Sequence, residues 1–246
     1  FFDAPHGLEQ QACVPREMIS GTVNVDGTGV AWWRDDEPEP LRYVTSAPPW
    51  ADANLQHLTR RLPGRAVLAA VRSATPGIPG GPASVAPFVD RELAVAHNGY
   101  VNGFGGPAGR RLIDRLPDEL HARLETRSDS LTLFLLMVAR RSERPGEALD
   151  ELLARVCTEV FELAREESVA ASLTLMACDG RQLAATRCAV GVPANTLYVS
   201  PRPDRRWPGG SVLMASEPLD ETGSWRAVED GHRILAGPSG LRTAPI

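Results

Sequence analysis

The chain of 246 residues contains no lysine, because all 26 of its basic residues are arginines. Schiff-base enzymes, P-loop nucleotide-binding proteins and protein kinases use a lysine in catalysis or phosphate binding, so these classes are excluded. The formal net charge is -5 and no dense arginine run occurs, which argues against a nucleic-acid or anionic membrane surface. We therefore expect a small-molecule or protein partner.

Cysteines and long apolar runs are also scarce. The four cysteines, at positions 13, 157, 178 and 188, form no C-x-x-C pair and lack the spacing of a structural zinc site. The longest mostly apolar run, residues 131–139, is far shorter than the ~20 residues that span a bilayer, and the first residues lack a signal-peptide pattern. We expect a chain in a reducing, cytoplasmic compartment, without metal or organic cofactor.

The chain does have enough apolar residues, 43%, for a substantial core, and no repeat or linker divides it, so we expect one domain over residues 1–246. Helical spacing of apolar residues predicts helices over 51–62, 129–141 and 146–167. Because these helices lie between two groups of strands, an α+β layered fold is favoured. Short apolar runs bounded by turn residues predict strands at 29–33, 66–71, 93–96, 170–178, 182–186, 196–200 and 212–215.

Polar residues at the ends of these elements are candidates for a site. Arg72 follows an apolar strand and can offer its planar guanidinium to a carboxylate. Asn98 and Gly99 follow another strand and can supply a side-chain and a backbone N–H, the donor pair that stabilises an oxyanion. Each residue also has a structural alternative: an ion pair for Arg72, a plain Asn-Gly turn, and a helix N-cap for Asp129.

Five segments together carry a resemblance. Their order is NVDGTGVAWW (24–33), AAVRSAT (69–75), AHNGYV (96–101), SDSLTLF (128–134) and ASEPLD (215–220). This ordered set resembles the class II glutamine amidotransferase-like proteins of the N-terminal nucleophile hydrolase superfamily, and among them the γ-glutamyl amidohydrolases of ergothioneine biosynthesis. The similarity runs from about Pro5 to Trp225.

The resemblance implies a four-layer αββα sandwich with two mainly antiparallel sheets. In such enzymes an N-terminal cysteine attacks the γ-glutamyl amide carbonyl, and its own α-amino group serves as the base. A thioester forms, an amine leaves, and water then frees glutamate. His97 is expected to pack or orient other groups, because this mechanism has no step for an imidazole base.

The same resemblance assigns roles to residues of this chain. Arg72 would bind the α-carboxylate of the glutamyl group and Asp129 its α-ammonium. Asn98 and Gly99 would form the oxyanion hole. Ser73 and Thr75 would contact the same ligand.

The start of the chain departs from the family pattern. Family members begin with Met-Cys-Arg, and residues 1–20 contain no match to it. Cys13 lies inside the chain, so its nitrogen is peptide-bonded and cannot act as the base. We therefore expect an N-terminally incomplete domain that lacks its first strand and its nucleophile and binds substrate better than it turns it over.

Three functions remain open at this point. The first is a γ-glutamyl amidohydrolase whose gene product begins upstream with the nucleophilic cysteine. The second is a glutaminase subunit that delivers ammonia to a separate synthase, as one protein of a complex or a homo-oligomer. The third is a catalytically dead glutamyl-binding or scaffold module.

Overall fold

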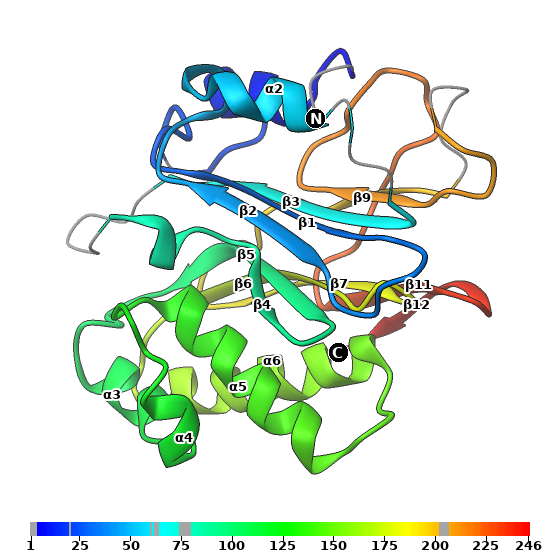
Figure 1. Cartoon of the computed structure of the whole chain (residues 1–246). Coiled ribbons are helices and arrows are strands. Elements are labelled where there is room, and N and C mark those ends of the chain that lie inside the picture. The colour runs from blue at the N-terminus through cyan, green and yellow to red at the C-terminus, as the bar shows by residue number, and fades with distance from the viewer. Residues whose placement is uncertain (1–3, 20, 60, 62–63, 74–79, 202–206) are drawn as a thin grey trace.

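A computed structural model describes residues 4–19, 21–59, 61, 64–73, 80–201 and 207–246. Two layers of β-strands lie face to face, with α1 (Leu8–Cys13) and α2 (Ala53–Thr59) outside one of them and the longer helices outside the other (Figure 1). All strand pairs in the described part of the chain are antiparallel. The expected four-layer αββα sandwich is therefore confirmed.

One of the two layers is a six-stranded sheet in the order β12-β11-β7-β6-β5-β4. Its members are β4 (Phe88–Asp90), β5 (Leu93–Val101), β6 (Ala171–Cys178), β7 (Leu183–Val190), β11 (His232–Gly237) and β12 (Gly240–Pro245). β4 is much shorter than β5 and pairs with it only as far as Val95. The rest of β5 therefore has an edge that β4 does not cover.

The facing layer holds two three-stranded sheets, in the orders β2-β1-β3 and β10-β8-β9. Their strands are β1 (Thr28–Trp33), β2 (Leu41–Thr45), β3 (Ala66–Val71), β8 (Tyr198–Ser200), β9 (Leu213–Ala215) and β10 (Arg226–Ala227). β3 and β9 are edge strands of these sheets and lie at the same level of the sandwich (Figure 1).

The remaining helices cover the outer face of the six-stranded sheet (Figure 1). They are α3 (Pro107–Ile113), α4 (Asp118–His121), α5 (Asp129–Glu143) and α6 (Leu149–Glu166). The apolar stripe of α6 is fully buried against the sheet, as its spacing predicted: Leu152, Leu153, Val156, Val160 and Leu163 are at most 1% exposed. Within the described residues, none of the helices has the length and apolar character needed to span a bilayer.

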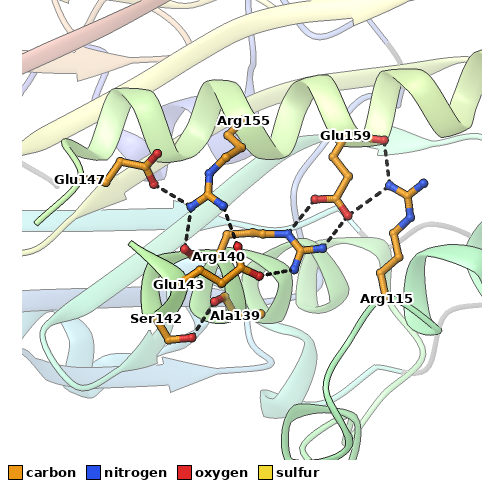
Figure 2. Close-up of polar contacts among 8 residues, drawn as sticks. All are labelled: Arg115, Ala139, Arg140, Ser142, Glu143, Glu147, Arg155 and Glu159. Atoms are coloured by element: carbon orange, nitrogen blue, oxygen red, sulfur yellow. Dashed lines mark hydrogen bonds and ion pairs between the residues drawn. The ribbon is translucent and has the colours of Figure 1, made fainter. Parts of the chain in front are cut away.

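Ion pairs join α5 to α6 at the surface of this layer (Figure 2). The Glu159 carboxylate accepts hydrogen bonds from Arg140 Nε at 2.8 Å and Nη2 at 2.7 Å. The same carboxylate lies 3.1 Å from Arg115 Nη1, just beyond α3. Arg155 pairs with Glu143 at 2.9 Å. These pairs fix how the two long helices pack against each other.

The structure corrects several sequence-based expectations. β5 does not end at Ala96 but continues to Val101, so residues 97–101 are part of the strand. Helix α6 begins at Leu149, three residues later than its spacing suggested. The sequence analysis missed five strands and three helices: β2, β4, β10, β11, β12, α1, α3 and α4.

Candidate active site

A cleft of about 2170 Å³ runs between the two sheets. Arg72, Ser73, Asn98, Gly99 and Asp129 all line it, so the structure brings together residues from three separate sequence segments. The remaining candidate, Thr75, lies outside the described residues.

Arg72 reaches the cleft from the end of β3. Its backbone N–H donates to Gly27 O at 2.9 Å, and its carbonyl accepts from Asp26 N at 2.9 Å, so the backbone is held by the turn before β1. In the guanidinium, Nη1 donates a long hydrogen bond of 3.5 Å to the Asp26 carbonyl oxygen. No carboxylate among the described residues forms an ion pair with Arg72. In this part of the chain, a structural ion pair therefore does not explain Arg72.

Asn98 and Gly99 lie inside β5, and the alternative of an Asn-Gly turn is wrong. Ala96 packs in the apolar cluster between the sheets, so Asn98, two residues further along, lies on the same face of the strand. The Asn98 Oδ1 accepts a hydrogen bond from Asn195 Nδ2 at 2.8 Å. With the carbonyl oxygen engaged, the amide nitrogen of Asn98 is the group left to donate toward the cleft.

The backbone N–H of Gly99 points to the uncovered edge of β5. Along an extended strand the N–H groups of alternate residues point to the same side. The Asn102 N–H donates toward β6, whereas the Val101 N–H donates to Asp129 Oδ2 at 3.0 Å. Gly99 therefore shares the side of Val101, away from β6, and offers a second donor close to Asn98.

Only glycine fits at position 99. Its φ is +153°, and an added Cβ would lie 1.9 Å from the carbonyl oxygen of Ser172 on β6. Any side chain at position 99 would therefore clash with the backbone of β6.

Asp129 is not the N-cap of α5. Ser128 is the N-cap, and its Oγ accepts from Leu131 N at 3.5 Å. The Asp129 carboxylate instead reaches the end of β5, where Oδ2 accepts from Val101 N, and its Oδ1 accepts from Ser130 N at 2.8 Å. It is 6% exposed and borders the cleft, and both of its oxygens are held in place by backbone N–H groups.

His97 also borders the cleft, and both of its ring nitrogens are engaged. Nδ1 is 3.0 Å from Ser130 Oγ and Nε2 is 3.2 Å from Ser172 O. Burial lowers the pKa of His97, and the nearby Asp129 charge only partly offsets this effect. A neutral, hydrogen-bonded imidazole matches the orienting role expected from the sequence.

None of the described cysteines has the properties of the expected nucleophile. Cys157, on α6, and Cys188, on β7, are buried in the core between that helix and the sheet. Cys178 borders the cleft, but burial raises its pKa to about 12, which disfavours the thiolate. Cys13 is exposed, yet it ends α1 and does not border the cleft, and burial together with Glu9 raises the pKa of its thiol.

One residue of the site escaped the sequence analysis. Asn195 follows β7 in an irregular segment with no recognisable motif, and only the fold places its amide beside Asn98. No sequence signal was available to find it.

No protein-family model matches the chain. Individual proteins do. Gamma-glutamyl-hercynylcysteine sulfoxide hydrolase of Mycolicibacterium smegmatis is 34% identical over 99% of this chain and 92% of its own length. The protein of the same name from Mycobacterium tuberculosis is 30% identical over 97% of this chain and 87% of its own length.

The chain belongs to the γ-glutamyl-hercynylcysteine sulfoxide hydrolase family. A solved structure agrees: a glutamine aminotransferase class-II domain protein from Silicibacter pomeroyi is similar with a TM-score of 0.69 and 26% identity, over 89% of this chain and 91% of the other. The family resemblance drawn from the five sequence segments is thereby confirmed. As a member of this hydrolase family, the chain is an enzyme of the class II glutamine amidotransferase fold.

Proposed function

We propose that the protein hydrolyses the γ-glutamyl amide bond of a conjugate such as γ-glutamyl-hercynylcysteine sulfoxide, releasing glutamate in ergothioneine biosynthesis. The observation that carries this proposal is the convergence of Arg72, Asn98, Gly99 and Asp129 on one cleft. The names of the curated relatives support it independently.

Two charged side chains select the glutamyl group in this proposal. Arg72 binds the α-carboxylate and Asp129 binds the α-ammonium of the same amino-acid end. A substrate that lacks either charge leaves a desolvated partner unpaired, which costs roughly 1–3 kcal/mol or more. The site is therefore specific for a free amino-acid end.

Two donors then stabilise the reaction's charged intermediate. A cysteine thiolate attacks the γ-carbonyl carbon, and the negative charge that develops on its oxygen is bound by Asn98 Nδ2–H and Gly99 N–H. The intermediate collapses to a thioester as the amine takes up a proton and leaves. Water then attacks the thioester, giving glutamate and the free thiol.

The nucleophilic thiol reaches this cleft, in the proposal, on an extended segment seated between β3 and β9. Both are edge strands of the described sheets, and all residues of both strands line the cleft. Uncovered strand edges present backbone donors and acceptors to which another strand pairs. This is where we propose that a strand carrying the nucleophilic cysteine pairs.

The function is tested by incubating the full-length gene product with a panel of γ-glutamyl amides and measuring released glutamate by liquid chromatography. We expect glutamate and free amine in equal amounts, and loss of both after alkylation of the N-terminal thiol. The Arg72→Ala variant should lose activity, while Arg34→Ala, which changes an exposed arginine paired with Asp36, should not. Glutamate binding without any amide cleavage would make the protein a binding module and overturn the proposal.

We also propose that the protein is cytoplasmic and that it binds a synthase partner or associates with itself. The four free thiols are consistent with a reducing compartment. Light scattering of the purified protein, alone and after co-purification, measures whether it forms oligomers or complexes.

A further inference from the structure

His97 forms hydrogen bonds to two different elements of the fold. It extends from β5, and its ring touches Ser130 in the first turn of α5 and Ser172 on β6. A backbone carbonyl can only accept, so Nε2 carries the ring hydrogen and donates it to Ser172 O. In this tautomer Nδ1 has a free lone pair and accepts the hydroxyl hydrogen of Ser130.

Ser130 connects the ring to the Asp129 carboxylate. The backbone N–H of Ser130 donates to Asp129 Oδ1 at 2.8 Å, while its hydroxyl hydrogen is given to His97 Nδ1. The second oxygen, Oδ2, accepts from Val101 N on the strand that bears His97. One carboxylate oxygen is thus bound by the residue whose hydroxyl contacts His97, and the other by the strand that bears His97.

The imidazole also lies against the oxyanion-hole glycine. A Cβ built on Gly99 would come within 2.8 Å of His97 Nε2. One ring therefore sits next to both halves of the proposed site: the carboxylate for the α-ammonium and the strand segment that carries the two donors.

We propose that His97 is a positioning residue that, through Ser130, holds the Asp129 carboxylate in the orientation that binds the substrate α-ammonium. This inference rests on the proposed function. It assigns His97 no contact with the substrate and no proton transfer. Its effect is on the discrimination between substrates with and without the α-amino group.

A pair of chromogenic substrates separates this role from a merely structural one. γ-Glutamyl-p-nitroanilide carries the α-ammonium, and glutaryl-p-nitroanilide lacks it. The full-length wild-type enzyme should prefer the first in kcat/KM. His97→Ala should reduce that preference by roughly tenfold or more, mostly through the γ-glutamyl substrate, because a misplaced carboxylate loses only the contact to the ammonium. Ser130→Ala should reduce the same ratio.

Further variants control the experiment. His97→Asn keeps a polar atom near the position of Nδ1 and should restore part of the preference, and it carries the test if His97→Ala does not fold. His57→Ala changes an exposed histidine on α2 and should leave the ratio unchanged. The double variant of His97 and Ser130 should lose no more than the larger single effect, because both act on one carboxylate.

An equal loss of kcat/KM on both substrates, or an unchanged ratio, would overturn the role of His97. If the wild-type enzyme cleaves neither substrate, the failure concerns the proposed function and not His97. Calorimetry on the same variants then measures the ratio of the affinities for L-glutamate and glutarate. A ratio lower than that of the wild type supports the positioning role of His97, and an unchanged ratio refutes it.

Discussion

At the scale of single residues, the proposed function gives Arg72 the role of binding the substrate α-carboxylate. It has no ion-pair partner among the described residues and borders the cleft, so a bound carboxylate would supply one. Arg72→Ala should weaken L-glutamate binding by about 10- to 100-fold, the effect of losing a charge-assisted pair worth about 1.5–3 kcal/mol. Isothermal titration calorimetry measures it, with Arg34→Ala as the matched control.

The substitution Gly99→Ala should destabilise the fold itself. Because the new Cβ would lie 1.9 Å from Ser172 O, β5 and β6 must move apart. We expect a loss of about 2 kcal/mol or more, a fall of roughly 4–8 °C in Tm. Gly105→Ala is the control, since nothing lies within 4 Å of its Cβ. Equal Tm values for the two variants would contradict the close approach.

The sequence indicated which residues border the cleft better than it indicated their hydrogen-bond partners. Arg72 and Asn98 were predicted as site residues because each follows an apolar run and lies in a segment of the family resemblance, and the structure places both on the cleft. The choice between Ser128 and Asp129 as the N-cap depends on backbone geometry around one residue, which composition does not fix. The hydrogen bond from Asn195 to Asn98 joins residues 97 positions apart, so only the fold could show it.

At the scale of elements, the α5–α6 pair depends on the carboxylate of Glu159. Burial alone raises the pKa of Glu159, but hydrogen bonds and charge from Arg140 and Arg115 outweigh it and hold that pKa below its usual range. A depressed pKa means that Glu159 stabilises the fold above its unfolded-state pKa, and that this contribution is lost as the pH falls through the folded-state value.

Glu159→Gln should therefore lower Tm at pH 7, by an amount equivalent to about 1–2 kcal/mol. The deficit relative to wild type should shrink as the pH falls below the ordinary glutamate value of about 4.3 and through the lower folded-state pKa, because the wild-type carboxylate then becomes protonated too. Thermal unfolding at several pH values measures this. Glu162→Gln, an exposed position on the same helix without a described ion pair, should show no such pattern.

Two of the strands that the sequence missed have few apolar residues facing a core. β12 is exposed at five of its six residues and β2 is half-exposed, so neither shows an apolar run. Residues 97–99 were placed beyond the end of a strand because polar letters and a glycine usually end one. They remain in β5 because β6 pairs with them on one side while the other edge stays open for Asp129 and the cleft.

At the scale of the whole molecule, ligand binding should couple to stability. A ligand that binds only the folded chain stabilises it by an amount set by its concentration relative to Kd, about 2.7 kcal/mol at 100 times Kd. L-Glutamate at that concentration should raise Tm by several degrees, and glutarate, which lacks the ammonium for Asp129, should raise it less. Equal shifts for the two ligands would show that Asp129 does not contribute to binding.

The two-sheet arrangement explains why these residues can meet at all. β3 and β5 belong to different layers, so the side chains at the end of one and along the other face a common cleft. The apolar runs and the family resemblance could predict the sandwich, but the spacing between its layers is a property of the packed molecule.

The measurement that tests this account most directly is a crystal structure of the protein with bound L-glutamate. The account predicts the α-carboxylate on Arg72, the α-ammonium on Asp129, and one γ-carboxylate oxygen between Asn98 Nδ2 and Gly99 N. A glutamate bound with its amino-acid end away from both charged side chains, or outside the cleft between the sheets, would contradict it.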